Sequence, residues 1–600
     1  MKEEKDKRGN KAAPASQTGL LQKLAKTLKL TLTYQEKRPG ESFVLSGTND
    51  TLGKKENHRS PQKTRKVLRR IPPVIPGKSG MEKGDYDWRK LRVDHQLAVN
   101  KTILEEIYSL PKNKDIIVRD FTIALDPPLQ AFAIFVEGLS DKEIINNAVL
   151  KPLMILTRLE KEEKISDVAS YLKKRILHGN EVEILDQYDG VLERVNYGGT
   201  AVFIEGIAKC LAIETKGWDK RAVGKPEVEQ VIRGPHEAFN ETLRSNTALV
   251  RKAIRSETLI TEMFKVGARN KADLAIMYLQ DLANSSLVEE VKRRITSIQT
   301  DFLGETGILE QFIEDHPFMP TPQMLSTERP DRVASFLIDG RVAILIDGNP
   351  NVLIVPITIF SLLHSAEDYY LRFPYGNLIR ILRTIATFLA IMIPGVYVAI
   401  TTFHQEMIPT DLVLAIAASR ETVPFPTIFE VFLMEFAFEL IREAGVRIPG
   451  IFGNTLGIVG ALILGQAAVQ AGIVSPILII VVAVTGLSSL AISNYSMSFA
   501  LRGIRFIFTA LAAVMGIFGI TTGLFILITS LSGMKSFGVP MLSPIGPRTI
   551  SEPDIILRGP IWSMDQREDY LETKDRPRQP RISRGWIKPK GKKEKGGPNG

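Results

Sequence analysis

The hydrophobic pattern divides the chain into a polar first two-thirds and a very apolar block from about Leu378 to Leu531. A helix needs about 20 apolar residues to cross the hydrocarbon core of a bilayer. Four runs in the block match or approach this length: Ile379–Phe403, Thr455–Val474, Ile477–Ile492 and Ile504–Leu531. We interpret the last run as the longest single span, and the first as a span broken at Pro394-Gly395. The pattern predicts a polytopic helical membrane domain behind a large soluble region.

Before this block, apolar runs alternate with amphipathic stretches, which is typical of an α/β fold. A buried strand at Gln130–Glu137 precedes a helix that Asp141 caps and that runs to about Leu153. The next expected elements are helices at Val168–Leu177 and Glu183–Val195 and strands at Thr200–Glu205 and Cys210–Glu214. Because strands alternate with helices, we expect mixed or parallel sheets.

The same arrangement recurs later in the soluble region. VFIEG ending at Gly206 corresponds to ILIDG ending at Gly348, and Ala133-Ile134 corresponds to Ala275-Ile276, with the same separation along the chain in both cases. We therefore expect two similar α/β subdomains, at 91–230 and 231–377, joined by a helix over Pro235–Ser256. The remaining predicted parts are a disordered basic tail at 1–90, a transmembrane helical domain at 378–535 and a C-terminal tail at 536–600.

The net charge of +10 is concentrated at the amino-terminal end, where residues 1–90 hold 22 Lys and Arg against 10 Asp and Glu. A polar, basic stretch of this kind is typical of a solvated tail, and we expect no nucleic acid partner. Within it, Gly19–Leu30 has the pattern of a short basic amphipathic helix, either transient or resting on a membrane surface. The stretch Met1–Leu30 lacks the apolar core of a signal peptide, so we expect a cytoplasmic soluble region.

The sequence does not predict an enzyme, a metal site or a bound cofactor. Cys210 is the only cysteine, which excludes a disulfide or a CxxC site within the chain. The strand ends Glu205-Gly206 and Asp347-Gly348 are either acidic sites or glycine turns, and we favour turns. RGPHE at Arg233–Glu237 opens the joining helix. Without a GxxxxGK[ST] or GxGxxG motif, we interpret Pro235 as a helix starter rather than part of an anion site.

The main candidate residues are charged groups inside the apolar block. The stretch Thr427–Ala444 is apolar but contains Glu430, Glu435, Glu439 and Glu443. A helical projection places Glu435, Glu439, Arg442 and Glu443 on one face, with Glu430 nearly opposite Glu439. Because charge is costly at a bilayer centre, this face should meet a pore, water or a partner charge. The alternative is an interfacial helix whose acids lie in water or pair with Arg442 and Arg447.

Small residues recur at helical spacing in two apolar runs, a pattern that lets helix backbones approach closely. The first stripe is Gly457, Ala461, Gly465, Ala468 and Gly472, with Gln466 and Gln470 one turn apart beside it. The second is Ala512, Gly516, Gly519 and Gly523. We interpret both as packing seams. The first stripe joins copies of the chain in an oligomer or packs within one chain, and the sequence leaves both open.

The basic residues around the block bear on its threading. Arg372, Arg380 and Arg383 precede the first run and fit the positive-inside rule. The basic tail after Arg576 favours a C-terminus on the same side. Other arginines, which we place in short loops, favour a different threading: Arg442, Arg447, Arg502 and Arg505. We expect both ends inside.

Several long motifs resemble the GerA-type family of spore germination receptor A subunits. They are FELIREAGVRIPG (Phe438–Gly450), IVGALILGQAAVQAGIVSP (Ile458–Pro476) and SFGVPMLSP (Ser536–Pro544), supported by VIRGPHEAFNETLRSN, EDYYLR, IPGVYVAITTFHQEMIPT and ASRETVPFP. The resemblance covers roughly Ile116–Pro547. The basic tail and the extension after about Arg548 lie outside the common family core.

This resemblance implies a two-subdomain cytoplasmic region and a multi-pass domain in the spore inner membrane, in contact with its lipid. It implies action with a transporter-like B subunit and a C-subunit lipoprotein, and assembly as a ring, suggested as five copies, that forms a cation channel. Two other functions compete with a nutrient-gated channel subunit. One is a secondary transporter, against which the absence of an evident repeat in the apolar block speaks; the other is a non-conducting membrane-anchored sensor or scaffold.

Overall fold

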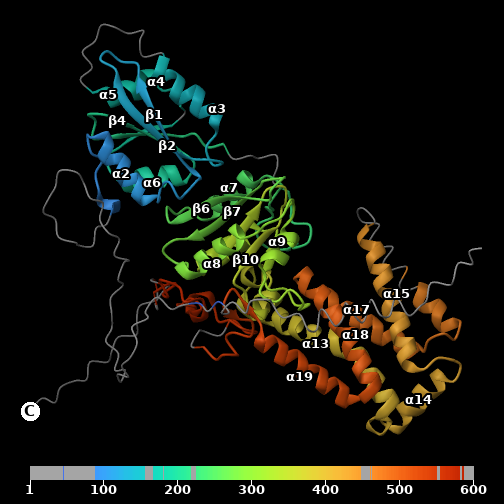
Figure 1. Ribbon diagram of the computed structural model, residues 1–600. Helices are drawn as coiled ribbons and strands as arrows, with labels where there is room; N and C mark the ends of the chain where they lie inside the picture. Colours follow the sequence, from blue (N-terminus) through green and yellow to red (C-terminus); the bar gives the residue numbers. More distant parts are fainter. Residues whose placement is uncertain are drawn as a thin grey trace, which may run out of the picture.

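The computed structural model describes residues 43, 45, 88–155, 167–179, 181–217, 224–447, 460, 463–549, 554–580, 584 and 586. Figure 1 shows two α/β subdomains followed along the chain by a helical domain.

Subdomain 1 is a five-stranded sheet between two helical layers. Its strands β1 (Ile116–Ile123), β2 (Leu129–Val136), β3 (Val182–Leu185), β4 (Thr200–Ile204) and β5 (Cys210–Ile213) lie in the order β1-β2-β4-β5-β3. One face packs against α2 (Leu97–Ile107) and α6 (Tyr188–Asn196). The other packs against the segment from α3 (Lys142–Ile144) to α4 (Lys151–Ile155), and against α5 (Val168–Tyr171). Asp141 caps α3 through its side chain, as predicted.

Subdomain 2 repeats this architecture. Its strands β6 (Leu259–Val266), β7 (Ala272–Leu279), β8 (Leu325–Thr327), β9 (Val342–Ile346) and β10 (Val352–Val355) lie in the order β6-β7-β9-β10-β8. Helices α7 (Leu243–Ala253) and α10 (Pro330–Ile338) cover one face, and α8 (Ser285–Thr296) and α9 (Thr306–Ile313) cover the other. The predicted internal repeat is therefore confirmed at the level of whole subdomains.

The predicted mixed or parallel sheets are wrong, because every neighbouring pair of strands in both sheets is antiparallel. The segment between β2 and β4 contains helices, which suggested a parallel crossover. It also contains β3, a strand at the far edge of the sheet. The strands β2 and β4 are therefore not joined by a single helical crossover, and they pair antiparallel. The predicted helix Glu183–Val195 is this strand followed by the shorter α6.

The spacing of the repeat also needs correction in its first half. The strands β4 and β9 match at the separation that relates Gly206 to Gly348. Their pairing partners, β2 and β7, then match at a separation that is one residue longer. Ile134 lies on the sheet face that α2 and α6 cover. The corresponding residue on the sheet face that α7 and α10 cover is Met277 rather than Ile276. Since side chains alternate across a strand, a one-residue slip exchanges the two faces.

The joining helix is shorter than predicted. It begins at Leu243 instead of Pro235, so Pro235 does not start a helix. The preceding backbone is used by long-range hydrogen bonds, because Phe239 N donates to Glu328 O at 2.9 Å and Pro235 O accepts from Arg329. A side-chain turn, in which Thr242 N donates to Asn240 Oδ1 at 2.9 Å, then precedes the helix.

After subdomain 2 and the short helices α11 (Ile359–Leu363) and α12 (Glu367–Tyr370), the chain enters the helical domain. This comprises α13 (Phe373–Phe403), α14 (Thr410–Arg420), α15 (Thr427–Arg447), α17 (Pro476–Leu490), α18 (Tyr495–Met515) and α19 (Ile517–Gly533), besides helical residues at 463–470. Among the described residues, α13 and α18 are long and apolar enough to cross a membrane, while α17 and α19 are apolar but shorter. α13 continues through Pro394 without the predicted break.

The predicted span Ile504–Leu531 is two helices, because the chain turns at Gly516. This glycine has φ +59°, in the left-handed region that side chains rarely adopt. α19 then packs back on α18. A methyl group added at Gly519 would lie 2.1 Å from the carbonyl oxygen of Leu511. The second stripe of small residues therefore forms a seam within one chain. The sequence did not reveal the turn, because the apolar run continues on both sides of Gly516.

The helical domain is continuous with subdomain 2. The core on the α7 and α10 face includes residues of α13, α18 and α19. The hairpin of β11 (Lys535–Ser536) and β12 (Val539–Pro540) follows α19 and joins the opposite core through Phe537. The predicted tail after residue 535 thus folds against subdomain 2 over much of its described length.

We predict that Gly519→Ala destabilises the full chain in detergent by about 1–3 kcal/mol, since its methyl group would force α19 away from α18. The control is Gly503→Ala in α18, where an added methyl group meets nothing within 4 Å. That change should leave the melting temperature unchanged or raise it, because alanine favours helix by up to about 1 kcal/mol. Equal melting temperatures for the two variants would contradict the seam.

Candidate functional site: the junction of subdomain 2 with the helical domain

The two acidic strand ends, interpreted as sites or turns, are helix caps. Glu205 accepts a hydrogen bond from the backbone N of Leu97 at 2.8 Å, and Asp347 accepts from that of Leu243 at 3.0 Å. Leu97 begins α2 and Leu243 begins α7. The glycine after each acid has a positive φ, of 81° and 85°, which agrees with the favoured turn. Each carboxylate satisfies an amide that the helix leaves unpaired.

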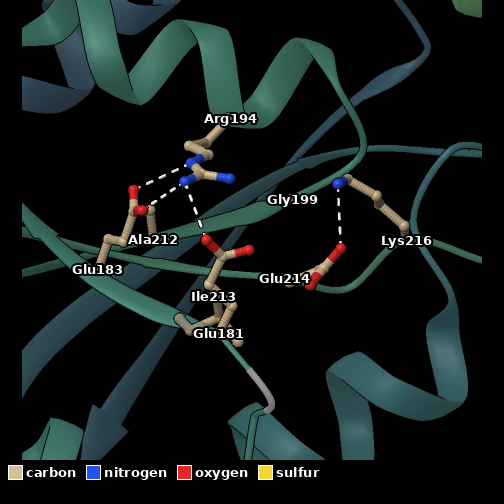
Figure 2. Close-up of a pocket in the computed structure, with 8 residues that line it drawn as sticks. All are labelled: Glu181, Glu183, Arg194, Gly199, Ala212, Ile213, Glu214 and Lys216. Atoms are coloured by element: carbon tan, nitrogen blue, oxygen red, sulfur yellow. Dashed lines mark hydrogen bonds and ion pairs between the residues drawn. The ribbon is translucent and has the colours of Figure 1, made fainter.

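The hollows in the described part of the protein are poor candidates for a ligand site. Figure 2 shows one in subdomain 1, where Arg194 pairs with Glu181 and Glu183, and Lys216 pairs with Glu214. It encloses about 10 Å³, which is about the room for one water molecule. A hollow of about 510 Å³ beside β6 and α8 is open to solvent.

The described residues also show no candidate site for a metal ion or a reactive thiol. No group of three or more His, Cys, Asp or Glu that could hold a metal ion occurs among them. Cys210 is fully buried in β5, and burial raises the pKa of its thiol far above the ordinary value. A thiol held protonated in this way is unreactive.

A dense group of buried charges lies where the chain enters the helical domain. Asp368 of α12 is fully buried. Arg383 of α13 donates to its Oδ2 and Oδ1 at 2.8 and 3.1 Å, and Arg380 donates to Oδ2 at 3.3 Å. Ser365 N adds a hydrogen bond at 3.0 Å. One carboxylate thereby holds the first turns of α13 against the end of subdomain 2.

A second carboxylate reaches this place from the C-terminal part of the chain. Asp554 forms an ion pair with Arg380 and accepts a hydrogen bond from the hydroxyl of Tyr369 at 2.6 Å. The carbonyl of Ile555 lies 2.6 Å from Nε2 of His364. We call Asp368, Tyr369, Arg380, Arg383 and Asp554 the junction cluster.

Burial and charge set the protonation states at this junction. Burial would raise the pKa of Asp368, but the hydrogen bond and charge of Arg383 outweigh it and lower that pKa below its ordinary value. Burial, reinforced by Arg380, lowers the pKa of His364 to about 4. At neutral pH the imidazole is therefore uncharged, and its Nε2–H donates to the carbonyl of Ile555.

The exit from the helical domain is tied to subdomain 2 as closely as the entry. Ser536 Oγ donates to Gln323 O at 2.7 Å and accepts from Ile357 N at 3.1 Å. The guanidinium carbon of Arg294 lies over the ring of Phe537, 4.1 Å from the centre of that ring. Ser536 and Phe537 belong to the SFGVPMLSP motif, which therefore connects α19 to the core of subdomain 2.

Residues 554–580, the C-terminal strap, continue this attachment. Glu568 pairs with the buried Arg341 at 2.7 Å, and Arg567 donates to Ile338 O at 2.8 Å. Lys574 donates to Gln280 O at 2.9 Å. The strap thus runs from the junction cluster over the end of α10 and β9.

A second buried cluster, the helical charge cluster, joins α15 to α18. Arg505 lies 2.7 Å from Glu435 and 3.1 Å from Glu439, while Arg502 and Arg442 lie 3.1 and 3.5 Å from Glu439. Glu435 and Arg505 are each 2% exposed. The helical projection correctly grouped Glu435, Glu439 and Arg442, whereas Glu443, the fourth residue of the projected face, is exposed. Placing Arg442, Arg502 and Arg505 in short loops was wrong, since all three stand within helices.

The other candidates lie apart from this cluster. Glu430 is buried on another side of α15, where it accepts a hydrogen bond from Ser475 N at 3.0 Å and pairs with Arg420 at 3.4 Å. Glu443 is exposed, as are Gln466 and Gln470.

The first stripe of small residues is described only in part. Gly457 and Ala461 lie outside the described residues. A methyl group added at Gly465 would contact Ile479 of α17 at 3.5 Å, and Ala468 packs in the same cluster of helices. Gly472 has φ +66° and ends the helical stretch. The described part of this stripe therefore packs within one chain, and a role in oligomers remains a prediction.

Sequence reasoning missed most of the junction. Arg380 and Arg383 were interpreted as positive-inside residues, yet both are buried against Asp368. Asp368 lies in the EDYYLR motif, which carried the family resemblance but no assigned role. An arginine pair spaced by three residues, directly after a short acidic helix, was the available signal. Asp554 had none, because 174 residues separate it from Arg380.

Comparison with known proteins gives matches over most of the chain. The family model described as Bacillus/Clostridium GerA spore germination protein matches residues 102–570. "Spore germination protein KA" of Bacillus subtilis (strain 168) is 38% identical over 82% of this chain and 91% of its own length. "Spore germination protein GerLA" of Bacillus cereus is 35% identical over 80% and 97%.

Two further similarities complete the comparison. "Uncharacterized membrane protein YfkQ" of Bacillus subtilis (strain 168) is 40% identical over 78% of this chain and 89% of its own length. A crystal structure titled as the N-terminal domain of the A subunit of the Bacillus megaterium spore germinant receptor GerK3 is 28% identical. It covers 44% of this chain, is itself covered to 97%, and gives a TM-score of 0.35.

We predict strong coupling between Glu435 and Arg505. Removing one partner of a buried ion pair costs about 3–5 kcal/mol, because the other charge is left buried and unpaired. Arg505→Gln should therefore lower the midpoint of unfolding in SDS sharply, and the double variant Glu435→Gln/Arg505→Gln should recover much of the loss. Glu421→Gln, an exposed change at the end of α14, serves as the control. Additive losses would show that the pair is not coupled.

We also predict that acid loosens the strap at His364. The folded pKa of about 4 lies below the ordinary value of 6.5 for a histidine, so the opened state binds more protons between these values. The stabilisation by neutral His364 is complete above about pH 6.5 and is lost as pH falls toward 4. Hydrogen exchange at residues 554–558, corrected for intrinsic rates, should accelerate over this window. His364→Gln should remove that acceleration, and equal slopes for both proteins would contradict the prediction.

Proposed function

This chain belongs to the Bacillus/Clostridium GerA spore germination protein family, and we propose that it is the A subunit of a nutrient germinant receptor. In this proposal it lies in the spore inner membrane with its soluble subdomains on the cytoplasmic side. It acts with a transporter-like B subunit and a lipoprotein C subunit. Several copies, suggested as five, assemble so that their helical domains form a nutrient-gated cation pathway.

The observation that carries this proposal is the pair of attachments between subdomain 2 and the helical domain. The junction cluster fixes the start of α13, and the hairpin with Ser536 fixes the end of α19. Both attachments use buried groups that resist separation, because an unpaired buried charge or hydrogen-bonding group is expensive. A movement of subdomain 2 would therefore be transmitted to both ends of the helical domain. The same contacts favour entry and exit on one side of the membrane.

The charge balance of the helical charge cluster restricts how a cation pathway could work. Glu435 and Glu439 face three guanidinium groups, those of Arg442, Arg502 and Arg505. With these pairs intact the carboxylates offer cations no surplus negative charge. In the proposed mechanism α15 moves away from α18 during the nutrient response. A ring of Glu439 and Glu435 would then attract cations and repel anions.

A second candidate function is a non-conducting sensor or scaffold subunit. The same pairing favours it, because acids neutralised within one chain do not require a pore. A secondary transporter has less support. Among the described helices, only α13 and α18 have the length and apolarity of full spans.

The channel and the scaffold differ in a flux measurement. We predict that the full chain in liposomes, alone or with its B and C partners, conducts cations on addition of nutrient. Glu435→Gln with Glu439→Gln should lower the cation-over-anion preference, because the pathway loses its carboxylates. Glu421→Gln, an exposed carboxylate at the end of α14, is the control and should behave as wild type. Absence of flux in every preparation, with a normal germination response in spores, would favour the scaffold. Unchanged selectivity in the double variant would exclude α15 from the pathway.

A further inference from the structure

One flank of α9, beside the side that packs on the sheet, carries exposed apolar side chains. Leu309 and Ile313 point into the core of subdomain 2 and are fully buried. Ile308 and Phe312, one helical turn apart on this flank, are 37% and 49% exposed, and Phe302 just before the helix is 62% exposed. Figure 1 places α9 at the outside of subdomain 2. Large apolar side chains gathered on a soluble surface typically mark a contact site.

The surroundings of this flank are acidic. Residues 301–315 contain no lysine or arginine and five acids: Asp301, Glu305, Glu310, Glu314 and Asp315. Two of them are paired within the chain, Asp315 with Arg294 and Asp301 with Arg269, which leaves the three glutamates. Burial, together with the charges of Glu314 and Glu305, raises the pKa of Glu310 to about 7. An occupant of this surface should therefore combine apolar side chains with positive charge, and an anionic lipid surface would be repelled.

We propose that the α9 surface is the docking site of the chain's own basic segment Gly19–Leu30. This segment, which lies outside the described residues, reads GLLQKLAKTLKL. As a helix it would place Leu20, Leu21, Leu24 and Leu28 on one side and Lys23, Lys26 and Lys29 on the other. Its leucines match the exposed apolar pair of α9, and its lysines match the surrounding acids.

Two described residues of the same tail bring this segment close to α9. Leu45 packs against the core that α8 and α9 share. Phe43 lies against Gly538, where an added methyl group would be 2.9 Å from its ring. The adjacent Phe537 N donates to Oδ2 of Asp315, two residues beyond α9, at 2.8 Å. The residues from 31 to 42 can span up to about 40 Å when extended, so the segment can reach the whole helix.

The test is a disulfide in the full chain, made possible because the native Cys210 is fully buried. Leu24→Cys combined with Phe312→Cys should form an intrachain disulfide under mild oxidation, detected by mobility without reductant and by peptide mass. The matched control combines Leu24→Cys with Ile155→Cys, another apolar position, 58% exposed, in subdomain 1. The control pair should cross-link far less.

Charge reversal separates docking from chance encounter. Lys23→Glu, Lys26→Glu and Lys29→Glu together should reduce the cross-link roughly tenfold, since repulsion between like charges replaces exposed ion pairs. Adding Glu305→Lys and Glu314→Lys should restore it. Equal cross-linking of the two cysteine pairs, or no effect of charge reversal, would overturn the proposal. A disulfide between two differently tagged copies would assign the surface to a second copy. Quenching of a fluorophore at position 312 by bilayer-embedded quenchers would assign it to the membrane.

Discussion

The structure depends on one buried carboxylate, that of Asp368, held between Arg380 and Arg383. Taking three charges out of water is unfavourable, and their attraction compensates only while the geometry is kept. Asp554 makes the arrangement more demanding, because Arg380 must satisfy two carboxylates from segments far apart in the chain. The start of α13, the end of subdomain 2 and the C-terminal strap therefore hold one another in place. Displacing any of them leaves a buried charge without its partner.

Comparing the two subdomains shows why this attachment is made by subdomain 2. At the separation that relates Gly206 to Gly348, three positions of subdomain 1 correspond to buried arginines of subdomain 2: Gln187 to Arg329, Gly190 to Arg332 and Gly199 to Arg341. The arginines bind, respectively, Pro235 O before α7, His364 O before α12, and Glu568 of the strap. The two subdomains share their sheet and layers. Only the second has guanidinium groups at these positions, which bind the segment joining the subdomains and those that lead into and out of the helical domain.

The sequence predicted whatever depends on neighbours along the chain. The strand ending at Gly206 and its repeat at Gly348, the capped helix after Asp141 and the acidic face of α15 follow from spacing and alternation, and the structure contains them. The matching letters of Ala133-Ile134 and Ala275-Ile276 misled by one residue, because strand register is set by pairing across the sheet. The turn at Gly516 was hidden because the apolar run continues on both sides of it. Asp554 could not be paired with Arg380 from the sequence, since nothing local links an exposed-looking tail residue to a membrane-proximal helix.

The two charge clusters differ in a way that suits transmission from the soluble region to the helices. In the junction cluster Asp368 is fully buried and bound by two arginines and a backbone amide, so that connection behaves as a fixed joint. In the helical charge cluster Glu435 is equally buried, but the side chain of Glu439 is 23% exposed and shared among three arginines. Because Glu439 is only partly enclosed by the protein, separating one of its contacts does not leave a fully enclosed charge without a partner. A displacement delivered through the rigid junction would therefore first separate the contacts of Glu439 and only then those of Glu435. In the proposed mechanism, the contacts of Glu439, rather than the buried junction, are therefore where the helical domain changes shape.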